Sequence, residues 1–304
     1  MNLIKTLPIP IAGLVLALLS LGNLLNDIHP GLKIIFGGLG CIFLALIMLK
    51  AIFYFDAVRQ DFQNPVIVSS SGTFSMSLMI LSTYLIPYTA SIAYALWIIG
   101  IALHIMLMIY FTYRFIIRDF DITNVYPTYW IVFVGITMGA ITSHAHAVEE
   151  IGFLFFAIGF LAMILTLPLV VYRYVRYPEI PDMNKPLICI FTAVLSILIV
   201  GYLNSAQNPS KEFIMILYPI ACLFYVFALY KFIDYRNLDF YPSFAAFTFP
   251  FVISALATKG AMACLGISLL NGILIIETVI AVMIVCYILI RYLKFLKNSN
   301  GSRT

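Results

Sequence analysis

The chain has 304 residues, of which 63% are hydrophobic and 10% are charged, and its formal net charge is +4. A water-soluble domain carries about 25% charged residues, so this composition excludes a soluble fold and predicts an integral membrane protein. The basic residues flank apolar stretches instead of clustering together, which argues against a nucleic-acid partner.

Ten apolar segments follow one another along the chain. A bilayer core about 30 Å thick needs roughly 20 apolar residues per helix, and cutting the sequence at polar and turn residues leaves ten stretches of about this length. They form a single all-α transmembrane domain of residues 1–297, followed by a polar C-terminal tail of residues 298–304. The expected segments are 8–26, 32–55, 68–87, 91–117, 127–145, 149–174, 185–205, 211–233, 241–260 and 268–293.

The distribution of basic residues orients these segments. With the N-terminus inside, only Lys33, Lys211 and Lys259 fall on the outer side, whereas the other 14 of the 17 basic residues fall on the inner side. This asymmetry is the one that the positive-inside rule requires. We therefore expect both termini, including Arg303, on the cytoplasmic side of the cell membrane.

Prolines near the start of each odd-numbered segment reveal a repeat. They are spaced 55, 62, 59 and 56 residues apart, about the length of one helical hairpin. The odd-numbered segments are also richer in Gly and Ser, which permits close backbone approach. We expect five hairpins in a pseudo-five-fold ring, with odd-numbered helices inside and bulkier even-numbered helices outside. The prolines are Pro10, Pro65, Pro127, Pro186 and Pro242.

Four short motifs, in this order, resemble the TehA and slow-type anion channel family, also called the tellurite-resistance/dicarboxylate transporter family. The resemblance extends over essentially all ten segments. It implies a homotrimer in which each protomer has its own pore, lined by the odd-numbered helices. The motifs are Leu7-Pro8-Ile9-Pro10 with Gly13, Asn64-Pro65 to Ser71-Gly72-Thr73-Phe74, Pro127-Thr128-Tyr129-Trp130 with Gly135, and Phe247-Thr248-Phe249-Pro250.

The resemblance also implies that a phenylalanine on the ninth segment occludes the pore. Phe249 matches this position, and Phe247 is the alternative. An aromatic ring in a narrow pore blocks ions sterically and by dewetting. Packing of Phe249 in an ordinary core stays open as the other interpretation.

Five further residues are candidates for shaping the pore. Prolines and glycines in membrane helices bend the backbone or allow close approach, and Pro250 in an apolar segment removes a backbone hydrogen bond. Simple bending without a role in transport is the alternative for Pro250. The candidates are Pro10, Gly13, Phe74, Gly135 and Pro250.

Two ionisable residues, Glu277 and His104, lie deep within apolar segments. Such residues are costly in a bilayer and mark functional sites by default, but on even-numbered segments we expect them to be packed or hydrogen-bonded internally. The outer-loop cluster of His144, His146 and the adjacent glutamates is better explained as solvated charge than as a metal site. No phosphate loop, metalloprotease motif or nucleophile elbow is present, so we expect neither an enzyme nor a cofactor.

Three classes of function remain: a channel, a transporter and a protein without transport activity. The sequence favours a gated channel for small anions such as chloride or nitrate, because the odd-numbered segments offer Ser, Thr and Asn but few charges. The alternatives are a secondary transporter of C4-dicarboxylates such as malate, possibly linked to protons, or an exporter associated with tellurite resistance. A scaffold or sensor whose path never opens is the third interpretation.

Overall fold

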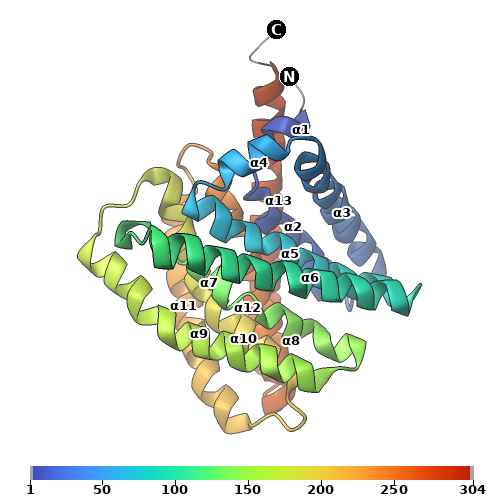
Figure 1. The fold of residues 1–304 in the computed structure, drawn as a ribbon. Coiled ribbons are helices and arrows are strands. Elements are labelled where there is room, and N and C mark those ends of the chain that lie inside the picture. Colours follow the sequence, from blue (N-terminus) through green and yellow to red (C-terminus); the bar gives the residue numbers. More distant parts are fainter. Residues whose placement is uncertain (1–2, 302–304) are drawn as a thin grey trace.

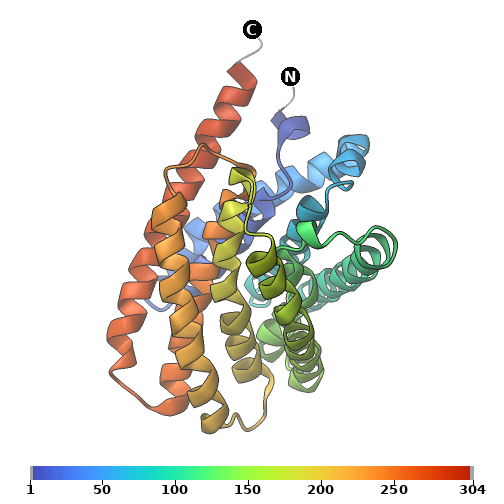
Figure 2. The same cartoon turned by 90° about the vertical axis from the view of Figure 1, so that its left-hand side faces the viewer.

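The computed structural model describes residues 3–301, and the side chains of residues 3–298. Every regular element in this range is a helix (Figure 1). Residues 1, 2 and 302–304, including Arg303 of the expected inner group, lie outside the described residues. The short helix α1 (Leu3–Thr6) and the last turns of α13 lie at the same end of the molecule, as Figures 1 and 2 show.

The even-numbered segments form long, continuous helices. Each is largely apolar and has many exposed large hydrophobic side chains, as a lipid-facing helix does. An amphipathic helix, α4 (Phe55–Asp61), follows the first of them. The long helices are α3 (Pro30–Phe53), α6 (Ala90–Phe111) with its π-helical extension η1 (Thr112–Arg118), α9 (Glu149–Arg176), α11 (Lys211–Tyr235) and α13 (Leu270–Gly301).

The odd-numbered segments are more deeply buried, and four of them are short or interrupted. Only the third forms one long α-helix, while 3-10 helices or turns stand at the start or in the middle of the others. A short 3-10 helix, η2 (Ile122–Asn124), precedes the fifth segment, and another, η3 (His144–His146), ends it. The odd-numbered segments are α2 (Ile11–Leu25), α5 (Pro65–Leu85), α7 (Thr128–Phe133) with α8 (Thr137–Ser143), η4 (Asp182–Cys189) with α10 (Ile190–Ser205), and η5 (Pro242–Phe247) with α12 (Phe249–Leu265).

The predicted prolines lie at or near these helix starts. Pro10 and Pro127 directly precede α2 and α7, Pro65 and Pro242 occupy the first turns of α5 and η5, and Pro186 lies within η4. Proline is tolerated there because the amide hydrogen it lacks has no helical acceptor. The sequence pattern thus predicted where these segments begin.

The odd-numbered segments contact one another in a closed circuit. Helix α2 packs against α5, α5 against α7 and α8, α8 against α10, α10 against α12, and α12 returns to α2. Each odd-numbered segment also packs against the even-numbered helix that follows it in the chain, as in α2 with α3 and α12 with α13. The even-numbered helices therefore lie around the circuit instead of completing it.

Eight helices within residues 3–301 are long and apolar enough to cross a membrane, and Ile11–Leu25 is a shorter apolar helix. The expected fifth segment, 127–145, is absent from this group because a turn at residues 134–136 divides it into α7 and α8. Helix α13 continues past residue 298, where the expected polar tail begins, to Gly301.

Candidate functional site

A cavity of about 60 Å³ lies between the odd-numbered segments, and all five segments contribute to its wall. We call it the central cavity. None of its lining residues is charged; only hydroxyl groups interrupt an apolar surface. The lining residues are Pro10, Gly13, Ser70, Thr73, Met76, Trp130, Ile131, Val134, Gly135, Leu187, Ile190, Ala193, Val194, Ile197, Ser243, Ala245, Ala246, Phe249 and Pro250.

The structure separates the two candidate phenylalanines. Phe249 is 6% exposed and lines the central cavity. Phe247 is fully buried and packs edge-on against Phe232 and Phe244, with ring centroids 5.2 Å away in both pairs. Phe249 therefore borders the cavity, whereas Phe247 belongs to an aromatic cluster beside it.

A break in the ninth segment produces this difference. Helix η5 ends at Phe247, Thr248 forms the junction, and α12 begins at Phe249. The hydroxyl group of Thr248 donates to the carbonyl group of Ala245 at 2.6 Å. Pro250 occupies the first turn of α12, so it does not bend a continuous helix as the sequence suggested; the helix starts there.

Gly13 allows close packing at the cavity wall. A Cβ atom on Gly13 would lie 3.2 Å from the Cβ of Ala245, tighter than ordinary van der Waals contact. The absence of a side chain thus lets α2 approach η5 closely, and Pro10 lines the cavity one turn earlier. These two predicted residues do lie together with Phe249 and Pro250.

Gly135 lies in the turn between α7 and α8. Its amide group donates to the carbonyl group of Trp130 at 2.9 Å, five residues back, instead of continuing the α-helical pattern. A Cβ atom at this position would lie 2.1 Å from the carbonyl oxygen of Ile131. Only glycine fits this backbone. Gly135 itself lines the central cavity.

Phe74 does not join the other predicted residues. It lines a separate groove of about 370 Å³, together with Ile9, Lys50, Phe62 and other residues of α3, α4, α5 and α6. Thr73, its neighbour in sequence, faces the central cavity. Adjacent residues on a helix point about 100° apart, so both cannot face the same space.

Glu277 and His104 are both buried, and neither lines the central cavity. The carboxylate of Glu277 on α13 accepts a hydrogen bond of 2.5 Å from Thr258 on α12, and Thr258 lies 3.0 Å from the hydroxyl group of Tyr218 on α11. His104 on α6 bridges α5 and the fifth segment. Both residues connect neighbouring helices within the protein.

The His and Glu residues between α8 and α9 form ordinary polar contacts. His144 pairs with Glu149 at 2.8 Å, and His146 lies 2.9 Å from the hydroxyl group of Ser82. Partial burial lowers the pKa of His146. Within the described part of the chain, no cluster of three His, Cys, Asp or Glu residues has a geometry that could hold a metal ion.

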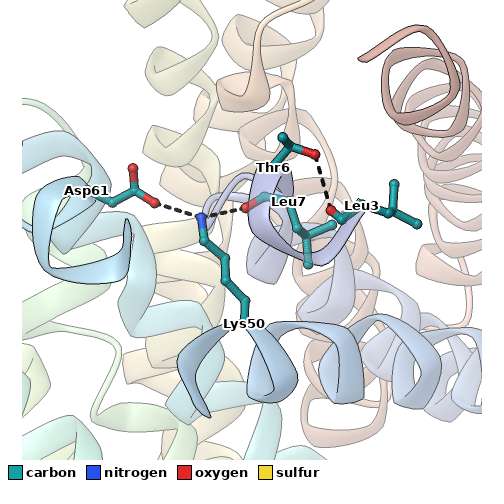
Figure 3. A network of polar contacts seen from close by, with 5 residues as sticks. All are labelled: Leu3, Thr6, Leu7, Lys50 and Asp61. Atoms are coloured by element: carbon teal, nitrogen blue, oxygen red, sulfur yellow. Dashed lines mark hydrogen bonds and ion pairs between the residues drawn. The ribbon is translucent and has the colours of Figure 1, made fainter. Parts of the chain in front are cut away.

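No sequence pattern predicted the structural role of Lys50. The side chain of Lys50 is almost fully buried in the last turn of α3. Figure 3 shows its ammonium group between the carbonyl oxygen of Leu7 and the carboxylate of Asp61, 2.8 Å from each. Lys50 thereby connects the segment that precedes α2 to α3, the even-numbered helix of the same hairpin.

The same arrangement recurs in two other hairpins. Arg173 on α9 donates to the carbonyl group of Thr123, which precedes α7. Arg291 on α13 donates to the carbonyl group of Leu238, which precedes η5. We call Lys50, Arg173 and Arg291 the clasps. The sequence predicted their positions at helix ends, but their acceptors are backbone atoms that no sequence pattern marks.

A comparison with protein families agrees with the geometry of a circuit of helices around an uncharged cavity. The sequence model described as voltage-dependent anion channel matches residues 6–293. The chain belongs to the voltage-dependent anion channel family. A comparison with curated proteins gives no match.

Membership in the voltage-dependent anion channel family confirms the resemblance to TehA and slow-type anion channels. The protein is accordingly an all-α, multi-pass membrane protein from a family of anion channels and transporters, and not from a family of enzymes.

Proposed function

We propose that the protein is a gated channel for small inorganic anions such as chloride or nitrate, with its path through the central cavity. Ten membrane crossings, arranged as five hairpins with the odd-numbered segments inside, would make up each protomer. The closed circuit of odd-numbered segments supports this arrangement, because it surrounds the cavity with one wall from every hairpin.

Phe249 is the proposed gate. Its side chain lines the cavity and is 6% exposed, and it follows directly after the break at Thr248. A ring in this position narrows an already small apolar space, and a constriction without polar groups is unfavourable for a hydrated ion. Rotation of the ring about χ1 opens the path in this proposal.

The uncharged wall is the single observation that carries the choice of substrate. Tight binding of a dicarboxylate calls for basic or strongly polar groups in the site, and the cavity lining contains no Lys, Arg or His. An apolar wall with hydroxyl groups from Ser70, Thr73 and Ser243 suits weakly held, rapidly moving monovalent anions. A C4-dicarboxylate carrier or tellurite-associated exporter therefore has less support.

The assembly and orientation are part of the same proposal. The exposed apolar faces of the even-numbered helices leave surface for lipid and for neighbouring copies, in keeping with a homotrimer in which each protomer has its own pore. The excess of basic residues on one side of the expected segments supports an orientation with both termini in the cytoplasm and the protein in the cell membrane.

Flux through proteoliposomes tests this function. The wild type, Phe249→Ala and the matched control Phe247→Ala are reconstituted at equal density, and the uptake of chloride, nitrate and malate is measured. A barrier lowered by only about 1.4 kcal/mol raises a rate about tenfold, so Phe249→Ala should raise chloride and nitrate flux by at least this factor. Phe247→Ala should not raise it.

Malate uptake by the wild type without chloride or nitrate flux in either folded variant would contradict the channel and favour the carrier. Equal activation by both alanine variants would contradict the assignment of Phe249 as the gate. Size-exclusion profiles of the purified variants establish that each one is folded.

A further inference from the structure

The break in the fifth segment leaves carbonyl groups without a backbone partner, and that of Val132 is one of them. The amide groups of Val134 and Gly135 both donate to the carbonyl oxygen of Trp130. The next amide donor, Thr137, binds the carbonyl oxygen of Val134. The carbonyl oxygen of Val132 thus receives no backbone hydrogen bond across the turn, although a buried carbonyl group without a donor is unfavourable, above all within a membrane.

His104 supplies the missing donor. Its Nε2 atom lies 3.0 Å from the carbonyl oxygen of Val132, and its Nδ1 atom lies 2.8 Å from the hydroxyl oxygen of Ser75 on α5. A carbonyl oxygen can only accept, so Nε2 must carry a hydrogen atom in this arrangement. In the neutral imidazole Nδ1 is an acceptor, so it shares the single hydrogen atom of the Ser75 hydroxyl group with the carbonyl oxygen of Gly72, which lies 2.9 Å from the same hydroxyl oxygen.

The imidazole ring also fits the shape of the break. A Cβ atom on Gly135 would lie 2.9 Å from the Cε1 atom of His104. The ring therefore packs directly against the residue that permits the turn. The side chain of His104 is fully buried, so water does not compete for the hydrogen bond to Val132.

The segment held in this way forms part of the cavity wall. Trp130, Ile131, Val134 and Gly135 all line the central cavity, and they flank the carbonyl group that His104 binds. His104 packs against this wall but is not itself a lining residue of the central cavity. Its two polar partners, Ser75 and the Val132 backbone, are uncharged, which argues against a proton relay through the ring.

We infer that His104 is a positioning residue for the anion path: its Nε2–H group holds the broken fifth segment so that the wall around Val134 and Gly135 keeps its shape. This inference rests on the proposed function for its link to permeation. Its structural part, the support of the break by His104, stands independently of that function.

Three substitutions separate the hydrogen bond from the bulk of the ring. In His104→Gln, the amide group can reach the position of Nε2 and donate to Val132. His104→Leu fills a similar space without a donor. His104→Asn is polar but too short to reach Val132, and it repeats the test if the leucine variant does not fold.

Hydrogen exchange measured by mass spectrometry in detergent reports on the break directly. His104→Leu and His104→Asn should increase exchange in peptides covering residues 133–138 by roughly tenfold, because the segment loses a buried hydrogen bond. Peptides from α10 should not change. His104→Gln should retain the wild-type exchange in both regions.

The same substitutions are then combined with Phe249→Ala, and the ratio of nitrate to chloride permeability is measured. Leucine and asparagine should change this ratio, and glutamine should restore it. Unchanged exchange at residues 133–138 in the leucine or asparagine variant, or an equal effect of glutamine, would overturn the inference. Absence of anion current from Phe249→Ala alone would instead refute the proposed function, while the exchange experiment would still decide the role of His104.

Discussion

The odd-numbered and even-numbered segments provide hydrogen-bond partners for their backbone N–H and C=O groups in two different ways. Helices α9 and α11 continue through Pro168 and Pro219, and a continuous α-helix pairs its backbone groups within the segment. The odd-numbered segments are interrupted at residues 134–136 and 248, where the side chains of His104 and Thr248 donate hydrogen bonds to backbone carbonyl groups. Irregular backbone is tolerated at membrane depth only where it is buried in protein or lines a cavity.

Proline alone does not decide where a helix breaks in this protein. Pro168 lies inside a continuous helix, whereas the turn at residues 134–136 contains no proline and depends on Gly135. Breaks occur where partners from neighbouring segments can take over the freed groups. Three changes test this difference, in order of decreasing effect.

Gly135→Ala should have the largest effect on stability. The new Cβ atom would lie 2.1 Å from the carbonyl oxygen of Ile131, a backbone atom that cannot move independently. We expect a loss of about 3 kcal/mol, as in severe overpacking of a core, and a lower apparent Tm in detergent. The matched control is Gly38→Ala on α3, where a Cβ atom meets nothing within 4 Å. A Tm for Gly135→Ala as high as that of the control would contradict the account of the break.

Substitution of the clasps by methionine should have the next largest effect. Lys50→Met, Arg173→Met and Arg291→Met each remove a donor to a backbone carbonyl that precedes an odd-numbered segment, at a cost of about 1–3 kcal/mol. In the other two hairpins, Arg114 and Lys231 form their ion pairs with half-exposed aspartates.

The methionine variants at Arg114 and Lys231 are therefore the controls for the clasps, with expected losses of at most about 1 kcal/mol. The five variants are ranked by apparent Tm, which is measured as the temperature at which the monodisperse peak in size-exclusion chromatography is lost. If the clasp variants and the control variants have the same Tm, the clasps contribute no more to stability than exposed ion pairs do, and they do not support the starts of the odd-numbered segments.

Glu277→Gln should have the smallest effect. The glutamine side chain can still accept the hydrogen bond from Thr258, and it removes the possibility of an uncompensated charge between α11, α12 and α13. We expect a Tm within about 1 °C of the wild type or above it, since a neutral replacement with retained hydrogen bonds costs little. In the Phe249→Ala background, chloride flux should also be unchanged. A strong loss of flux would indicate a transport role for this carboxyl group.

Much of the architecture could be predicted because it follows from hydropathy and from proline chemistry. Apolar runs mark the segments, and Pro65 and Pro242 mark the first turns of their helices, because the missing amide hydrogen is harmless only there. The family resemblance singled out Phe249, which borders the cavity. The prediction that Phe249 gates the path still awaits the flux measurement.

The rest depends on three-dimensional partners that sequence patterns do not reveal. Phe74 and Thr73 are equally plausible in sequence, but only the direction of each side chain on α5 decides which one faces the cavity. Gly135 is one of 17 glycines, and its special role appears only with the carbonyl group of Ile131 beside it. Lys50 reads as a flanking charge until its backbone acceptor at Leu7 is known.

The central claim is that the uncharged cavity carries anions once Phe249 no longer blocks it. The most direct test is the reversal potential of Phe249→Ala channels in a planar bilayer with a gradient of potassium chloride, because the Nernst potentials of chloride and potassium then have opposite signs. We expect currents that reverse near the Nernst potential of chloride and a nearly silent wild type. Currents that reverse near the potential of the cation, or no current from folded Phe249→Ala protein, would contradict it.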